Sequence, residues 1–324
     1  MPKFLVIRFS SIGDIILTSP VVRCLKQQVK DAEVHFLTKK SFYPVIEHNP
    51  FIDKKIAFEE GYRSLISELK KEKYDTVIDL HHNLRTCIIK RALGVKSFSF
   101  HKENFNKWKM VNLKQRMTLP HVVERYLQTV SHFGVINDGK GLDYFLPDEL
   151  NVTDPFSKKK LPKHFQSGYL AVVVGARHVT KQPPVAMLSS LIKNRNAVLL
   201  GGKEDFQRAE QIRQNENQIN LCGKLSLHES AWLIKHSQKV VTPDTGLMHI
   251  AAAFGKEIIS LWGNTVPGFG MTPYFGNKQG KSKIFEVELP CRPCSKIGFK
   301  DCPKKHFDCM NKQDAAAIGK AIES

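Results

Sequence analysis

Apolar positions along this chain alternate between two spacings. Short runs rich in valine, isoleucine and leucine alternate with stretches whose apolar residues recur at helical spacing. The pattern predicts strands at residues 3–9, 33–38, 75–80, 97–100, 170–174, 197–200, 219–222, 240–242 and 257–262. It predicts helices at residues 19–28, 42–48, 62–71, 85–93, 122–133, 184–193, 204–215, 226–236 and 246–254. Such alternation indicates parallel sheets covered by helices on both faces.

A polar, turn-rich stretch at residues 137–167 interrupts this alternation. We therefore expect a domain over residues 1–150, a linker over 151–167 and a second domain over 168–324. The fold class is α/β, with two Rossmann-like, doubly wound parallel sheets. Ligands of such sheets bind beyond the carboxyl ends of the strands, so we expect one cleft between the two carboxyl edges.

Composition and charge narrow the class of protein. Forty-nine Lys and Arg against 31 Asp and Glu leave a net charge of +18, which attracts anionic partners or serves only solubility. The basic residues are spread along the chain, which argues against a nucleic-acid partner. No apolar run is long enough to cross a membrane, and the N-terminus has the pattern of a first strand and not of a signal peptide. We expect a cytoplasmic protein.

The first loop, after residues 3–9, contains a candidate catalytic acid. Gly13 allows a tight bend and close approach of a substrate, and Asp14 follows it at the carboxyl end of the strand. Two roles fit Asp14. It is a general base that accepts a proton from an attacking hydroxyl, or it is a helix cap without chemistry.

A second candidate site begins where the strand at residues 240–242 ends. Asp244, Thr245 and Gly246 open a helix, and His249 projects from its first turn. Free N–H groups and the helix dipole make such a start suitable for a diphosphate. A well-capped core helix with a buried histidine is the alternative.

Cationic residues gather in the loop that follows the first strand of the second domain. Arg177, His178, Thr180 and Lys181 lie there, at what we expect to be the same sheet edge as Asp244. Cations at this edge would stabilise the charge of a departing pyrophosphate. An ordinary polar surface loop would have the same composition.

On the acceptor side, Asn83 and Arg85 follow the strand at residues 75–80. An arginine binds a phosphate or carboxylate with two parallel hydrogen bonds, and an amide binds sugar hydroxyls. The basic stretch from Lys102 to Arg116 is either a mobile acceptor loop or solvated surface.

Two motifs in this order identify a resemblance to a known family. Ser10-Ser11-Ile12-Gly13-Asp14 near the start, and Asp244-Thr245-Gly246-Leu247-Met248-His249 followed by Leu261-Trp262-Gly263-Asn264-Thr265, resemble the heptosyltransferases of glycosyltransferase family nine. The resemblance covers nearly the whole chain. It implies a GT-B architecture, with a closing helix at residues 313–322 that packs back toward the first domain. It also implies an inverting transfer of a sugar, by default heptose from ADP-heptose, to an anionic glycolipid such as lipopolysaccharide core.

The resemblance assigns roles to residues of this chain. Asp14 is the general base and Lys181 a catalytic, phosphate-binding cation. The remaining donor-binding positions are Ser11, Gly13, Thr180, Gly202, Glu204, Asp244, Thr245, Gly246 and His249, and the acceptor-binding positions are Asn83 and Arg85. No Asp-x-Asp pair is present, so we expect neither a metal nor another cofactor. We expect a monomer that makes peripheral contact with the inner face of the cytoplasmic membrane.

Four cysteines lie close together near the C-terminus, at Cys291, Cys294, Cys302 and Cys309. The first pair has zinc-ligand spacing, but the second does not. A structural zinc, reduced thiols and a disulfide all stay open.

Two other functions fit parts of the sequence. A sugar-nucleotide epimerase of the same architecture would need acid and base groups but no acceptor site. A non-catalytic polyanion-binding protein would need only the positive charge, and its binding would depend steeply on salt. Neither accounts for both motifs.

Overall fold

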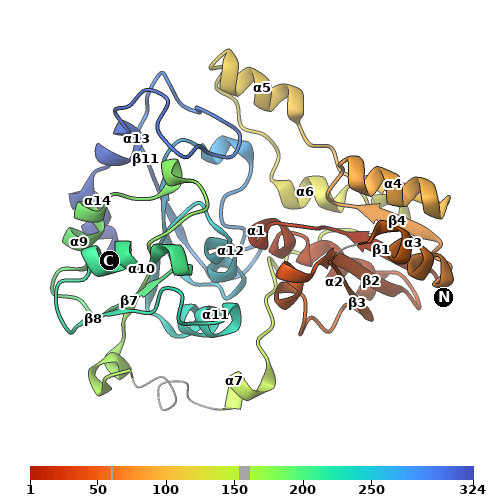
Figure 1. Cartoon of the computed structure of the whole chain (residues 1–324), viewed down its shortest axis with the longest axis horizontal. Coiled ribbons are helices and arrows are strands. Elements are labelled where there is room, and N and C mark those ends of the chain that lie inside the picture. Colours follow the sequence, from red (N-terminus) through yellow and green to blue (C-terminus); the bar gives the residue numbers. More distant parts are fainter. Residues whose placement is uncertain (60, 153–160) are drawn as a thin grey trace. The chain divides into compact units, whose positions relative to one another are not determined.

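The computed structural model describes residues 1–59, 61–152 and 161–324, and the chain divides into two compact units (Figure 1). The first unit comprises Met1–Glu103 and Pro120–Phe145, and the second comprises Asn104–Leu119 and Leu146–Ser324. We expected residues 1–150 to form one domain, but residues 104–119 belong to the second unit. Residues 153–160 of the expected linker lie outside the described residues.

The first unit is built on a parallel sheet of five strands in the order β3-β2-β1-β4-β5. Its elements are β1 (Lys3–Ile7), α1 (Ile12–Ile16), α2 (Ser19–Gln28), β2 (Glu33–Lys39), η1 (Lys40–Val45), β3 (Lys54–Phe58), α3 (Tyr62–Lys71), β4 (Thr76–Asp79), α4 (Leu84–Leu93), β5 (Lys96–Ser99), α6 (Val122–Leu127) and η2 (Ser131–Phe133).

Helices bury both faces of this sheet because alternate residues of each strand point to opposite sides. Leu5 and Ile7 of β1 pack with residues of α3 and α4 in one core cluster. Phe4, on the other face, contacts the ring of Phe133 in η2 with centroids 5.0 Å apart. The central strand is therefore covered on both sides, as a doubly wound sheet requires.

The second unit has a parallel sheet of six strands in the order β11-β10-β9-β6-β7-β8. Its elements are α5 (Asn104–Asn112), α7 (Asp148–Val152), η3 (Lys163–Ser167), β6 (Leu170–Val173), η4 (Val179–Lys181), α9 (Val185–Ile192), β7 (Ala197–Leu200), η5 (Lys203–Asp205), α10 (Phe206–Ile212), β8 (Gln218–Asn220), α11 (Leu227–His236), β9 (Lys239–Pro243), α12 (Gly246–Ala253), β10 (Glu257–Trp262), η6 (Pro267–Phe269), β11 (Ser282–Glu286), α13 (Asp308–Asn311) and α14 (Ala315–Glu323). The α/β class with two parallel-sheet domains is confirmed.

The C-terminal helix α14 belongs to the core of the second unit. Ile318, Ala321 and Ile322 are buried in the same cluster as Leu188 and Leu191 of α9. We expected this helix to pack back toward the first domain. Its apolar face is buried against α9 and the sheet of the second unit, which it stabilises, and its packing toward the first domain stays a prediction.

The structure differs from the expected elements where an apolar pattern is weak or is ended by local hydrogen bonds. The edge strands β3 and β11 have only short apolar stretches, Ile56–Phe58 and Ile284–Phe285, between charged residues, so the pattern did not reveal them. The expected helix at 122–133 ends after Leu127, where the Thr129 hydroxyl donates to the Tyr126 carbonyl oxygen at 2.6 Å. Part of the basic stretch expected as a loop is the helix α5.

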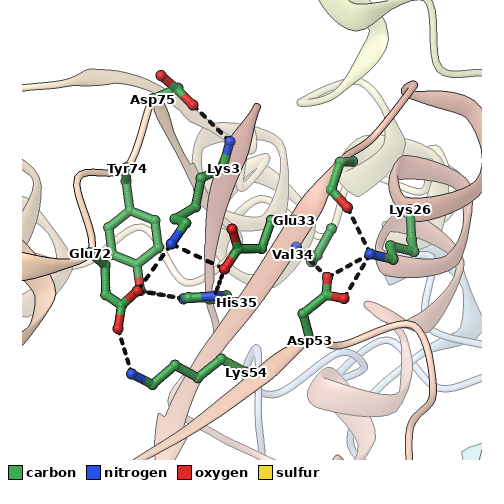
Figure 2. A network of polar contacts seen from close by, with 11 residues as sticks. Lys3, Lys26, Glu33, Val34, His35, Asp53, Lys54, Glu72, Tyr74 and Asp75 are labelled. Carbon is green, nitrogen blue, oxygen red and sulfur yellow. Dashed lines mark hydrogen bonds and ion pairs between the residues drawn. The ribbon is translucent and has the colours of Figure 1, made fainter. Parts of the chain in front are cut away.

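An ion network joins the first residues of three strands in the first unit (Figure 2). The Lys3 ammonium lies 3.0 Å from a Glu33 oxygen and 3.1 Å from a Glu72 oxygen. The other Glu72 oxygen pairs with Lys54 at 2.5 Å. These contacts hold together the amino ends of β1, β2 and β3, the edge opposite to the one where parallel sheets bind ligands.

The network shifts the titration of its members. The Lys54 ammonium, opposed by burial and assisted by Lys3, lowers the pKa of Glu72 to about 2. Burial and the charges of Glu72 and Glu33 raise the pKa of Tyr74, so its hydroxyl stays protonated 2.8 Å from His35 Nδ1. Every polar group of the network has a partner, so we assign it a structural role.

Replacement of Glu72 by Gln should make the free energy of unfolding depend less on pH in the acid range. The folded-state pKa lies below the ordinary 4.5, so this carboxylate stabilises the fold above pH 4.5 and loses that effect as the pH falls toward 2. Because the site is partly exposed and screened, we expect Glu72→Gln to lower the free energy of unfolding by only about 1 kcal/mol at pH 7. Urea unfolding followed by circular dichroism at several pH values measures this.

Glu68→Gln, at an exposed position on α3, is the matched control and should change little at any pH. A deficit of Glu72→Gln that stays constant from neutral pH into the acid range would contradict the role of this carboxylate.

Candidate active site

The first unit places its candidate catalytic residues where the strand order changes direction. The strand β1 has β2 on one side and β4 on the other, and the chain leaves β1 and β4 at the same sheet edge. Ligands of doubly wound sheets bind at this switch point. Arg8 and Asp14 follow β1, and His81 and Asn83 follow β4.

Asp14 is the third residue of the short helix α1 and contacts both Ser11 and Arg8. One carboxylate oxygen accepts hydrogen bonds from the Ser11 hydroxyl at 2.8 Å and the Ser11 N–H at 3.2 Å. The other lies 2.8 Å from Arg8 Nη2. Asp14 therefore caps a helix and also presents a paired, partly exposed carboxylate at the ligand-binding edge of the sheet, so both roles expected for it are compatible.

Arg8 is a buried cation that the sequence analysis did not single out. Its guanidinium donates to the carbonyl oxygens of Ser10 at 2.7 Å and Leu80 at 2.5 Å. Burial is the largest single effect and disfavours its charge, but Asp14, Tyr126 and Asp79 together outweigh burial and raise the pKa of Arg8. Arg8 therefore places a permanent positive charge directly beside the Asp14 carboxylate.

Two buried polar atoms beside this pair are left for a ligand. His81 Nδ1 and the Tyr126 hydroxyl are buried, and neither has a hydrogen-bond partner among the described residues. The Arg8 guanidinium lies 5.9 Å from the Tyr126 ring centre. Burial and the charges of Arg8 and Lys102 lower the pKa of His81 to about 4, so its imidazole is neutral at pH 7. The sequence analysis missed both residues, since nothing in a single sequence shows that a residue near position 126 returns to the end of β1.

The two expected acceptor-binding residues lie at the start of α4. Asn83 is the N-cap, and its side-chain oxygen accepts from the Thr86 N–H at 3.0 Å. Arg85 is exposed on the first turn. The Asn83 oxygen is thus already engaged in capping, whereas the Arg85 guanidinium is accessible to an anion.

In the second unit the strand order changes between β6 and β9, and the structure brings Lys181 and Asp244 together there. The Lys181 ammonium lies 2.6 Å from Asp244 Oδ2, and the Thr265 hydroxyl donates to the same oxygen at 3.0 Å. One carboxylate thus joins the ends of β6, β9 and β10. An ammonium has three N–H donors, so this pair leaves Lys181 able to bind an anion as well.

The helix α12 begins directly after Asp244. Thr245 is its N-cap in an extended conformation, with its hydroxyl 3.3 Å from that of Thr242, and Gly246 is its first residue. His249 is buried one turn later. The first N–H groups of such a helix point toward the switch point and suit a phosphate.

Thr180, which we expected to bind the donor, is buried and holds the loop in place. Its hydroxyl lies 3.1 Å from Asn264 Oδ1 and accepts from the Phe299 N–H at 2.8 Å. A Cβ at Gly263 would lie 2.6 Å from the Thr180 carbonyl oxygen. Only glycine lets the loop that contains Lys181 pack this closely on the end of β10.

The expected nucleoside contacts surround a buried carboxylate that the sequence analysis missed. Asp205 accepts from the Gly202 N–H at 2.9 Å, and a Cβ at Gly175 would lie 2.0 Å from its carboxylate. Burial raises the pKa of Asp205 above its ordinary value despite that hydrogen bond. Glu204, next to it, is exposed and accessible to a ligand hydroxyl.

Arg292 was also missed, because an arginine within a cysteine-rich stretch has no sequence signal of burial. Its guanidinium donates to the carbonyl oxygens of Gly263 at 2.5 Å and Thr265 at 2.9 Å and pairs with Glu286 at 2.9 Å. It therefore fixes the loop from which Thr265 reaches Asp244.

The C-terminal cysteines are all free thiols. Cys291 Sγ lies 3.9 Å from His306 Nε2. Within the described part of the chain, these thiols are not among the side chains grouped closely enough to hold a metal ion. Burial raises the pKa of Cys294 to about 11 and that of Cys309 to about 12, so both are protonated at neutral pH.

Comparison with known families gives one match over most of the chain. The model of glycosyltransferase family 9 (heptosyltransferase) matches residues 62–303. The chain belongs to glycosyltransferase family 9. The resemblance inferred from the two motifs is thereby confirmed, and with it the assignment of the chain as a glycosyltransferase.

Curated family 9 proteins align over most of their length. A lipopolysaccharide heptosyltransferase 1 of Campylobacter coli is 26% identical over 316 residues, which cover 88% of this chain and 89% of that protein. A lipooligosaccharide heptosyltransferase 2 of Haemophilus influenzae is 26% identical over 317 residues, which cover 89% of this chain and 90% of that protein.

Solved structures of family 9 share the fold. A family 9 glycosyltransferase of Veillonella parvula is 20% identical with a TM-score of 0.76, over 99% of this chain and 96% of that one. The heptosyltransferase II of Escherichia coli is 20% identical with a TM-score of 0.70, over 99% of this chain and 100% of that one. The two parallel-sheet domains are thus those of the GT-B heptosyltransferases.

Gly263→Ala should destabilise this glycosyltransferase. The new Cβ would meet backbone at the Thr180 carbonyl oxygen, which cannot move without shifting the Lys181 loop, so we expect a loss of about 2 kcal/mol. Chemical unfolding followed by tryptophan fluorescence measures it.

Gly319→Ala in α14 is the control, because its Cβ would meet nothing within 4 Å. Removal of a helical glycine should stabilise the protein by about 0.5 kcal/mol. If both substitutions changed stability equally, close packing at Gly263 would not be the reason for its glycine.

Proposed function

We propose that this chain is an inverting heptosyltransferase that transfers heptose from ADP-heptose to a hydroxyl of lipopolysaccharide core or a similar anionic glycan. Its family and the names of its curated relatives support this substrate class. The observation that carries the proposal is the Lys181–Asp244 pair beside the start of α12, at the switch point of the second sheet. The E. coli heptosyltransferase WaaC, of the same fold, was solved with ADP and with ADP-2-deoxy-2-fluoro heptose.

The second unit supplies the donor site. The Lys181 ammonium and the first N–H groups of α12 bind the diphosphate, with Thr245 and Gly246 at the helix start. Glu204 and the backbone at Gly202 contact the nucleoside. As the bond between the anomeric carbon and the phosphate oxygen breaks, negative charge grows on ADP, and these groups stabilise it.

The first unit supplies the base. The acceptor hydroxyl attacks the anomeric carbon from the face opposite to the leaving ADP, which inverts the configuration. Asp14 accepts the hydroxyl proton as the new glycosidic bond forms. Arg8 keeps the carboxylate anionic and in place, and Ser11 holds its other oxygen. Arg85 binds an anionic group of the acceptor.

No helix in the described part of the chain is long and apolar enough to cross a membrane. With a nucleotide-sugar donor and a glycolipid acceptor, we place the reaction at the inner face of the cytoplasmic membrane, reached by peripheral contact.

Asp14→Asn tests the base assignment. The amide keeps the shape of the carboxylate but cannot accept the proton, so kcat should fall by about a hundredfold or more. Release of ADP with a core-oligosaccharide acceptor measures turnover, and calorimetry measures donor affinity, which should stay within about twofold.

Asp31→Asn, at an exposed turn position, is the matched control and should leave both quantities unchanged. Turnover of Asp14→Asn at the level of the parent protein would rule out the base assignment.

A second test separates a lysine-based site from a metal-based one. Lys181→Ala should weaken ADP binding about tenfold and lower kcat further, because the leaving-group charge loses its cation. Lys193 is an exposed lysine at the end of α9, and Lys193→Ala should change neither ADP binding nor kcat. A chelator should leave the rate of the parent protein unchanged. Activity lost in chelator and restored by magnesium would refute a metal-independent mechanism.

A further inference from the structure

The helix α5 has two apolar faces, of which the fold buries one. Met110 is buried against Leu119 and Phe269 in a small core cluster of the second unit. Phe105 and Trp108 project elsewhere, with 65% and 46% of their surface exposed, and their rings stack with centroids 6.3 Å apart. Packing within the unit accounts for the Met110 face only.

Further apolar side chains are exposed on neighbouring segments of the same unit. Leu113, just after α5, is 60% exposed, and Ile297, in the segment after β11, is 63% exposed. The two segments are in contact, because the Lys296 ammonium donates to the Asn104 carbonyl oxygen at 3.4 Å and Lys114 donates to that of Pro293 at 2.9 Å. Figure 1 shows α5 and this segment on the same side of the second unit.

Positive charge surrounds these apolar side chains. Residues 104–119 contain four basic residues and no acidic one, and residues 295–305 contain four lysines and one aspartate. The basic residues are Lys107, Lys109, Lys114, Arg116, Lys296, Lys300, Lys304 and Lys305. The Lys109 ammonium lies 4.5 Å from the Phe105 ring centre, so cation and aromatic ring are presented together.

A cavity of mixed apolar and charged lining opens beside this surface. It has a volume of about 340 Å³ and is lined by apolar side chains such as Met110, Met117 and Leu289, by the cations Lys114, Arg116 and Arg292, and by the carboxylates Glu286 and Glu288. Glu288 pairs with Arg116 at 3.2 Å and Glu286 pairs with Arg292 at 2.9 Å, so the positive charge that faces outward comes mainly from the lysines.

We propose that the surface formed by Phe105, Trp108, Leu113, Ile297 and the surrounding lysines docks on an anionic phospholipid bilayer. Aromatic and aliphatic side chains enter the interface between head groups and acyl chains, and the lysines pair with lipid phosphates. A second copy of this chain fits less well, because two such surfaces would repel each other. Single-stranded nucleic acid fits less well too, since Leu113 and Ile297 offer no ring on which a base stacks.

This inference deepens the membrane contact of the proposed function but is tested without catalysis. The protein is mixed with sucrose-loaded vesicles of phosphatidylcholine, with or without phosphatidylglycerol, in the absence of donor and acceptor. We expect sedimentation with the anionic vesicles only, and release by high salt. Vesicle binding and sugar transfer are separate measurements, so failure of one does not imply failure of the other.

Substitutions locate the surface. Trp108→Ala and Leu113→Glu should each lower the partition onto anionic vesicles about tenfold. Ile136→Glu, at a position 72% exposed in the first unit, should leave it unchanged. All three positions are exposed, and circular dichroism verifies the fold.

Tryptophan fluorescence gives a local signal, because Trp232 and Trp262 are buried and Trp108 is not. Anionic vesicles should shift the emission of the parent protein to the blue and leave that of Trp108→Phe unshifted, while Trp108→Phe still sediments. Equal binding to both vesicle types, or full binding by Trp108→Ala and Leu113→Glu, would overturn the proposal. So would a dimer that dissociates in these two variants, or binding to single-stranded DNA without binding to vesicles.

Discussion

A charge placed at the edge of a parallel sheet keeps a defined position only if a partner holds it there, and in each unit an ion pair at the switch point does so. Arg8 pairs with Asp14 beyond β1, and Lys181 pairs with Asp244 beyond β6 and β9. Each pair lies at the point where the strand order reverses, the place that the topology leaves open to ligands. The charges that the proposed reaction needs are therefore already oriented before a substrate arrives, and little reorganisation is required of them.

The second pair also depends on its supporting contacts within the second unit. Asp244 also accepts from Thr265, whose backbone is held by the buried Arg292, and the loop of Lys181 packs on Gly263. The cysteine-rich stretch around Arg292 thereby contributes to the site through packing.

The sequence predicted most of the fold because buried strands and capped helices have local signals. The helix at residues 19–28 was predicted with its observed bounds, and the strands at the sheet centres were found to within a few residues. The edge strands β3 and β11 were missed, since their apolar stretches are short and flanked by charged residues. For the candidate site, motifs alone selected Asp14, Lys181 and Asp244, and the roles of these residues stay predictions. Arg8, His81, Tyr126 and Asp205 could not be selected, because their importance follows from burial and from neighbours distant in sequence.

The chain crosses between the two units at three places, since residues 104–119 leave the first unit to join the second before the chain returns. Met110 and Leu119 complete a small core with Phe269, more than a hundred residues later. Suppose that two family members exchanged their halves at a single junction near residue 150. The α5 of one parent would then have to pack against the Phe269 core of the other parent. Modular recombination of donor and acceptor specificities in this family has to move α5 together with the C-terminal half.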